Sequence, residues 1–210
     1  ADPTRRYTLG DGRPAVGLGA CREAVDTQQG GRPVWLFLFS GAEGAPREGD
    51  AVFGERAARI GHANVLRVLD HGRWQDTPFV ATEPADAFTL AGVLEGLRST
   101  GAWAALDDVR HAFDALCQGV AAGHRDRTRA SPEHGLLSPR SVLLGGQHAP
   151  GRPLGAPEVK VMDFGLARWL GLRCPMPEGV ADARAPEQRA DPSALSPAGD
   201  VFALGALLAT

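Results

Sequence analysis

The chain has 210 residues, of which 43% are hydrophobic and 22% are charged, and its net charge at pH 7 is −3. This composition is typical of an ordinary soluble globular protein and excludes a disordered one. The negative net charge gives no electrostatic case for nucleic-acid binding, which requires a basic face. No stretch reaches the roughly 18 apolar residues of a membrane span, and the first residues lack the apolar run of a signal peptide. We therefore expect a cytoplasmic protein without a membrane span in these residues.

Cysteine and histidine spacing does not favour a metal site. The three cysteines, Cys21, Cys117 and Cys174, lie far apart and are odd in number, so reduced thiols are expected. No pair of the six histidines has ligand spacing on one helix, which favours structural roles for them. These histidines are His62, His71, His111, His124, His134 and His148.

Residues 1–83 are predicted to form mainly strands, with one helix. The continuous apolar run from Val34 to Phe39 predicts a buried strand. Residues 52–60 favour a helix, because Ala57 and Ala58 are good helix formers. Short strands are predicted at 65–69 and 79–82, on either side of a turn at Asp70-His71-Gly72.

Residues 84–131 are predicted to be helical. Apolar residues recur there at steps of three and four, which is typical of an amphipathic helix. The charged run 125–129 is interpreted as the solvated end of this helix. Two strands are expected next, at 142–144 and 159–162, joined by a Gly/Pro-rich loop. The apolar stripe consists of Leu106, Val109, Phe113, Leu116 and Val120.

The segment Val159–Arg168 carries the strongest chemical signal. Four residues of strand character lead into Asp163, Phe164 and Gly165. An acid at the exit of a strand, beside a glycine, can hold a divalent cation on a polyphosphate. For an isolated motif, an ordinary strand followed by a turn would be the better interpretation. Five other segments supply context, namely 62–65, 77–83, 134–144, 185–187 and 200–205.

In this order, the six segments resemble the eukaryotic-like serine/threonine protein kinases of bacteria, over roughly residues 7–210. The resemblance implies an α+β, bilobal, protein-kinase-like fold in one domain. Residues 1–83 would form the sheet-rich N-terminal lobe, and residues 84–210 a helical C-terminal lobe that is truncated, because the helices that normally complete it are missing. A nucleotide would lie in the cleft between the lobes. The positions that match this cleft are Gly17, Gly19, Trp35, Phe37, Thr82, Glu83, Ala85, Asp86, Leu143 and Asp163.

The resemblance also shows that the catalytic segment is degenerate. The family sequence His-Arg-Asp-Leu-Lys-Pro-x-Asn supplies a catalytic base, a phosphate-binding lysine and a metal ligand. Here Leu136 stands at the Asp, Ser138 at the Lys and Ser141 at the Asn. Leucine cannot accept a proton, and a serine hydroxyl is a poorer metal ligand than the amide. No catalytic residue is intact, and Asp163 remains as the candidate metal ligand, with Ser141 a poorer one.

The N-terminal segments are degenerate in the same way. Phe37 occupies the position of the strand Lys that pairs with the nucleotide phosphates. Pro14 and Val16 occupy the first two glycine positions of the loop that covers the phosphates, although proline has no amide to offer. Glu55 is the candidate for the helix Glu, but it lies closer to His62 than is usual. With Phe37 in the Lys position, the family's ion pair cannot form.

Trp35 aligns with the small residue that packs over the adenine ring in active relatives. Its indole could fill the space of a purine ring. Alternatively, Trp35 points into the core of the lobe with the register slipped by one, since such a slip reverses the side-chain face. We favour the first interpretation.

Control by phosphorylation is not expected. The segment between Gly165 and Ala185 contains no Ser, Thr or Tyr, and Gly135 replaces the Arg that would receive a phosphate. His134, Phe164 and Asp200, by contrast, match positions that stack or anchor the core in this family. The scaffold is retained while the reactive groups are absent.

The leading hypothesis is therefore a pseudokinase, which is not expected to be an enzyme. It would work by binding a protein partner or the remainder of a longer polypeptide, in regulation or scaffolding. ATP and Mg²⁺ are not firm cofactor predictions. The alternative is an ATP-binding serine/threonine kinase or another nucleotide-using transferase with unorthodox or weak activity through Asp163, in which Asp86 or Glu83 contacts the nucleotide. A third interpretation is a passive module of a larger membrane or envelope protein.

Overall fold

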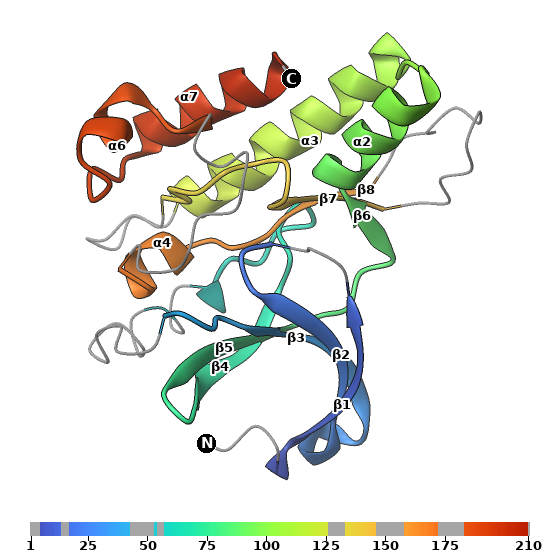
Figure 1. Cartoon of the computed structure of the whole chain (residues 1–210), viewed down its shortest axis with the longest axis vertical. Coiled ribbons are helices and arrows are strands. Elements are labelled where there is room, and N and C mark those ends of the chain that lie inside the picture. The colour runs from blue at the N-terminus through green and yellow to red at the C-terminus, as the bar shows by residue number, and fades with distance from the viewer. Residues whose placement is uncertain are drawn as a thin grey trace.

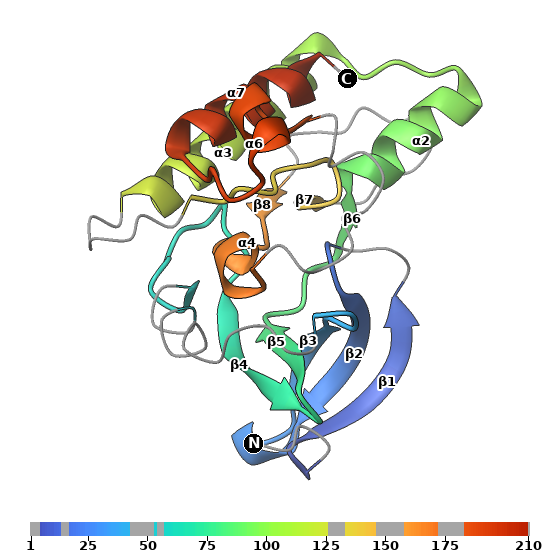
Figure 2. The same ribbon diagram turned by 60° about the vertical axis from the view of Figure 1, so that its left-hand side comes forward.

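The computed structural model has an α+β fold, as the sequence predicts, with a large sheet in the N-terminal part and most of the helices in the C-terminal part (Figure 1). Segments of both parts meet around the short helix α4 (Figure 2). The structure describes residues 5–13, 17–42, 53, 57–125, 133–145, 158–171 and 183–209.

Five antiparallel strands form the N-terminal sheet, in the order β1-β2-β3-β5-β4. The short 3-10 helix η2 (Thr27–Gln29) connects β2 to β3. The predicted strand at 34–39 is confirmed as β3. The strands are β1 (Tyr7–Arg13), β2 (Ala20–Asp26), β3 (Arg32–Leu38), β4 (Val68–Trp74) and β5 (Thr77–Thr82).

The predicted turn at Asp70-His71-Gly72 is wrong, because these residues lie within β4. The hairpin instead turns at Gln75 and Asp76, whose φ values are 47° and 70°. Two consecutive residues with positive φ are what a tight type I′ hairpin requires. The sequence lacks the usual Asn-Gly signal there, so the turn was not recognisable.

The start of the chain is tied to the sheet by charge. Arg6 pairs with Asp26 at 2.6 Å and with Asp70 at 2.7 Å, and the Tyr7 hydroxyl donates to Asp70 at 2.8 Å. The hydrogen bond from Arg6 holds the pKa of Asp26 below its ordinary value, although burial acts in the opposite direction. This cluster joins β1, β2 and β4 at one end of the sheet.

A second sheet and the remaining helices form the C-terminal part. The strands pair antiparallel in the order β6-β7-β8, and the prediction of uninterrupted helix from residue 84 missed β6. The strands predicted at 142–144 and 159–162 are confirmed as β7 and β8. The elements are β6 (Ala87–Thr89), α2 (Leu90–Thr100), α3 (Leu106–His124), β7 (Val142–Gly145), β8 (Glu158–Val161), α4 (Leu166–Trp169), α6 (Pro186–Ala190) and α7 (Pro197–Leu208).

Helix α3 buries only part of its predicted stripe. Leu116 and Val120 pack in the core with β8, whereas Leu106 is 74% exposed and Val109 is 37% exposed. The stripe is therefore correct in its C-terminal half, where α3 lies against β8 and beside α7 (Figure 2).

Several predicted features fall wholly or partly outside the described residues, among them the charged run 125–129, of which only Arg125 is described. The helix expected at 52–60 is described only at Phe53 and from Ala57 onward, and Glu55 lies outside. The same is true of Pro14, Val16 and Cys174. In the described part of the chain, no helix is long and apolar enough to cross a membrane.

Candidate functional site

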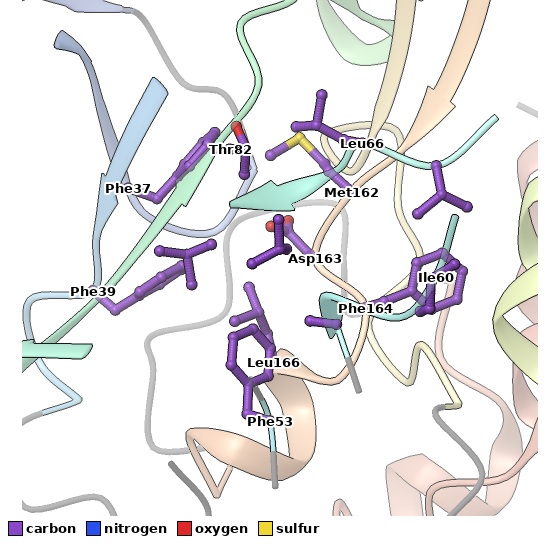
Figure 3. A pocket seen from close by; sticks show the side chains of 14 residues that line it. Phe37, Phe39, Phe53, Ile60, Leu66, Thr82, Met162, Asp163, Phe164 and Leu166 are labelled. Carbon is purple, nitrogen blue, oxygen red and sulfur yellow. The ribbon is translucent and has the colours of Figure 1, made fainter. Parts of the chain in front are cut away.

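Asp163 lies at the centre of the molecule, two residues after β8. The Met162 backbone N–H donates to the Ser141 carbonyl at 2.9 Å, which joins this strand exit to the segment before β7. The backbone of Asp163 is in the left-handed region at φ 71°, an uncommon conformation for a residue other than glycine. Held in this way, the carboxylate points toward the side chains of the surrounding cavity (Figure 3).

The surroundings of the Asp163 carboxylate are almost entirely apolar. A cavity of about 20 Å³, room for one water molecule, lies beside it. The residue as a whole is half-buried, but its Oδ2 atom is shielded from solvent and accepts no hydrogen bond. Burial raises the pKa of Asp163 to about 7, against the lowering effect of a hydrogen bond from the Leu18 backbone. The cavity is lined by Phe37, Phe39, Phe53, Ala57, Ile60, Val65, Leu66, Val68, Val80, Thr82, Met162, Asp163, Phe164 and Leu166.

The loop that precedes β2 closes over Asp163. The Gly17 N–H donates to the Arg140 carbonyl at 3.1 Å. This bond links the loop to residues 134–144, named the catalytic segment here for the kinase motif that they are predicted to match. Gly17 has a φ of 63°, and a Cβ atom there would lie 2.7 Å from Met162 Cε and 2.9 Å from Asp163 Oδ2. Only glycine permits so close an approach of the backbone. At Gly19, a Cβ would lie 3.0 Å from the Leu38 carbonyl oxygen.

Strand β3 sends two aromatic side chains toward the C-terminal part. Trp35 and Phe37 are each 1% exposed and belong to one apolar cluster with Leu143 and Met162. Their rings meet edge to face, 6.4 Å between centroids. The alternate residues of β3, such as Leu36, pack on the opposite face of the sheet. The apolar side chains on the inner face of β3 therefore fill the space between the sheet and β7.

Leu136, predicted from the motif order to stand at the position of a kinase catalytic acid, packs in an apolar environment. Its side chain is 4% exposed and forms a small cluster with Ala167, against which Leu18 and Leu195 pack. This cluster joins the loop before β2, the catalytic segment, α4 and the loop before α7. The position thus contributes a packing contact and no proton acceptor.

The two serines of the catalytic segment differ in their hydrogen bonding. Ser141 Oγ accepts from the Ser138 N–H and donates to the Ser138 carbonyl, both at 2.9 Å, so it braces its own loop. Ser138 Oγ is buried and makes no hydrogen bond. Neither hydroxyl makes a hydrogen bond to the Asp163 carboxylate.

Asp200 holds the start of the catalytic segment. Its carboxylate accepts from the backbone N–H groups of His134 and Gly135, at 2.8 and 2.7 Å, and lies 2.8 Å from His124 Nε2. His134 in turn is fully buried, and burial lowers its pKa. Its Nδ1 accepts the Leu136 N–H, so Nε2 carries the proton and donates to the Met162 carbonyl at 2.7 Å. Phe164 packs edge to face on this imidazole, 4.9 Å between centroids.

An aromatic cluster fixes α4 against the N-terminal sheet. Trp169, 2% exposed, stacks on Phe53 at 4.4 Å between centroids and 10° between planes. The same indole meets Phe39 and His71 edge to face. Sequence reasoning missed Trp169, because its partners are separated from it by roughly a hundred residues or more.

The linker after β5 is held by an ion pair. Glu83 lies 3.0 Å from Lys160 Nζ, and Lys160 also lies 3.3 Å from Glu158. A separate cavity of about 220 Å³ adjoins this linker, with Ala85, Asp86 and Leu143 in its wall. Of the predicted nucleotide residues, the structure therefore groups Glu83, Ala85 and Asp86 here, whereas Gly17, Phe37 and Thr82 lie around Asp163.

The residues present do not fit a bound Mg²⁺ in this arrangement. Mg²⁺ requires several oxygen ligands and usually retains waters, but Gly17 and apolar side chains enclose the Asp163 carboxylate. Across the described residues, there is no group of three or more His, Cys, Asp or Glu side chains that could hold a metal ion.

Comparison with known proteins gives a distant relationship to a kinase-like protein. The chain is 28% identical over 166 residues to a protein of Arabidopsis thaliana named a probable inactive receptor kinase, and the match covers 76% of this chain. The chain spans only 23% of the length of that relative. No family model matches the sequence.

Proposed function

We propose that the chain is a pseudokinase with a bilobal kinase-like fold, residues 1–83 forming one lobe and 84–210 the other. It acts by binding a protein partner or the rest of a longer polypeptide, and it does not transfer a phosphoryl group. One observation carries the proposal: Phe37 lines the cavity beside Asp163, Trp35 packs in the same apolar cluster with Leu143, and Gly17 and Leu18 close over the carboxylate.

The chemistry of phosphoryl transfer supports this proposal. Catalysis of that reaction depends on positioning and on charge stabilisation of the transferred group. Leu136 and Phe37 are buried in apolar clusters, so neither a base nor a phosphate-binding cation stands at those positions. Asp163 keeps an ionisable group, but its surroundings disfavour the ionised form.

The distant relative supports the same class of protein, since it is described as an inactive kinase. The relative is a plant protein, so membership of the bacterial branch of the family stays a prediction. A cytoplasmic location also stays a prediction.

An exposed apolar face on α7 supports protein binding as the mode of action. Val201 is 62% exposed, Phe202 43% and Leu208 57%. Contiguous exposed apolar surface is typical of sites that pack against protein. The exposed residues of this helix and its C-cap are Pro197, Ala198, Val201, Phe202, Gly205, Leu208 and Ala209, none of them charged.

We expect that millimolar ATP with Mg²⁺ or Mn²⁺ leaves the melting temperature of the wild-type chain unchanged. A ligand at 100 times its Kd would add about 2.7 kcal/mol to the unfolding free energy, so binding would be visible. Trp35→Ala is expected to introduce a nucleotide-dependent shift, because it removes the indole from the face that looks toward Leu143. Thermal shift and calorimetry measure both effects.

Leu36→Ala is the matched control for this experiment. Leu36 neighbours Trp35 on β3 and is equally buried, but its side chain lies on the opposite face. It should destabilise the chain without creating nucleotide binding. A shift of several degrees in the wild type, or phosphate incorporation that Asp163→Ala abolishes, would contradict the proposal.

The second candidate function is a nucleotide-using transferase of unusual mechanism. The observation that favours it is the 220 Å³ cavity beside Ala85 and Asp86, at the positions predicted to contact a nucleotide. The thermal-shift measurement with ATP decides between the pseudokinase and the transferase. If the chain is a transferase, the wild type should show a nucleotide-dependent rise in melting temperature, and Asp86→Ala should reduce that rise.

A further inference from the structure

The loop before β2 has three independent attachments to the C-terminal part of the chain. The first is the hydrogen bond from the Gly17 N–H to the Arg140 carbonyl. The second is the hydrogen bond from the Leu18 N–H to the Asp163 carboxylate. The third is the packing of the Leu18 side chain against Leu136 and Ala167. A loop that merely covers a ligand needs none of these contacts with the opposite side.

We propose that residues 17–19 form a strap that holds the cleft shut, with Leu18 as its apolar anchor on Leu136 and Ala167. Leu136 then has a structural role of its own, as the seat of the strap. The inference rests on the proposed function, because it explains how the closed form that a partner would recognise is maintained without nucleotide.

The geometry of Gly17 shows how tightly the strap closes. The atoms that a Cβ would meet belong to Met162 and to the Asp163 carboxylate, so the backbone lies directly on them. Leu195 extends the seat from the far side, because a Cβ at Gly135 would lie 2.8 Å from Leu195 Cδ2. The strap therefore closes onto a preformed apolar surface made of three separate segments.

Hydrogen exchange at the amides of Gly17 and residue 18 tests the strap directly, since both N–H groups lose their partners when it opens. In the wild-type chain without nucleotide we expect slow exchange at both amides. Leu18→Ala should raise the exchange rate at both at least tenfold, relative to amides of β5. Leu9→Ala, which shortens an exposed leucine on β1, should leave both unchanged.

Two substitutions in the catalytic segment distinguish a local opening of the strap from a general loss of stability. Leu136 and Leu137 are 4% and 2% exposed, but Leu137 belongs to the other core cluster, with α3 and β8. Both Leu→Ala substitutions should lower stability, whereas only Leu136→Ala should accelerate exchange at Gly17 and Leu18 beyond the global effect. Fast exchange in the wild type, or no acceleration in Leu18→Ala, would overturn the inference. The measurement uses no nucleotide, so its failure is distinguishable from failure of the thermal-shift test.

Discussion

Asp163→Asn is expected to stabilise the chain by about 2 kcal/mol at pH 8. The ionised carboxylate is penalised in the fold, since burial raises its pKa from 3.8 to about 7. Each pKa unit corresponds to about 1.4 kcal/mol, and the expected value is below the resulting maximum because the residue is only half-buried. Asparagine has a similar shape without the charge. Urea unfolding at several pH values measures the difference between variant and wild type.

The difference in unfolding free energy between Asp163→Asn and the wild type should depend on pH with a defined sign. Between about pH 4 and pH 7, the folded state keeps a proton on Asp163 that the unfolded state has lost, so stability falls as pH rises. The advantage of Asp163→Asn should therefore grow through this window and level off above it. Asp26→Asn is a control of opposite sign, because its pKa is lowered by Arg6. That variant should lose stability at neutral pH, and the loss should diminish in acid. An advantage of Asp163→Asn that is independent of pH would refute the explanation.

Gly123→Ala is expected to destabilise the chain by about 3 kcal/mol, the upper end of the range that is typical when a packed core is overfilled. A Cβ atom at this position of α3 would lie closer than 3.0 Å to three carbons of the Phe164 ring. Phe164 is itself held between α3 and His134, so it has little room to move. Gly119→Ala should act in the same direction, since its Cβ would lie 2.5 Å from the Asn64 carbonyl oxygen.

Gly96→Ala on α2 is the matched control. Gly96 is also inside a helix, but it is exposed and no atom lies within 4 Å of a Cβ placed there. Alanine is preferred to glycine in helices by about 1 kcal/mol, so this variant should be slightly stabilised. Equal effects at Gly96 and Gly123, measured by chemical denaturation, would show that helix propensity and not contact with Phe164 decides the result.

Local patterns were sufficient for much of the fold. The apolar run at Val34–Phe39 predicted β3, and the residues before Asp163 predicted β8. These predictions succeed because strand and helix periodicity reflect burial of one face. The turn at Gln75-Asp76 was missed because it lacks the glycine that usually marks a tight hairpin. Strand β6 was missed because its three residues are too few to show an alternating pattern.

The site illustrates a different limit of sequence reasoning. The motif order alone predicts that Leu136 and Phe37 stand where a kinase carries an acid and a lysine, and the structure shows both side chains buried in apolar clusters. That Leu18 and Leu195 pack around Leu136 could not be predicted, because the three residues are far apart in sequence. The same holds for Trp169 and Phe53, whose stacked rings join α4 to the segment before β4.

The sequence by itself determined the α+β class, the order of the segments and the apolar or hydroxyl side chains at Phe37, Leu136, Ser138 and Ser141. It did so because each of these depends on residue identity and on local periodicity. Only the tertiary structure decided what these side chains contact. Packing in three dimensions placed Trp35 and Phe37 toward Leu143, and it brought Gly17 onto Asp163. Burial of apolar surface between distant segments is a property of the folded chain, and it is what encloses the one acid that the motif retained.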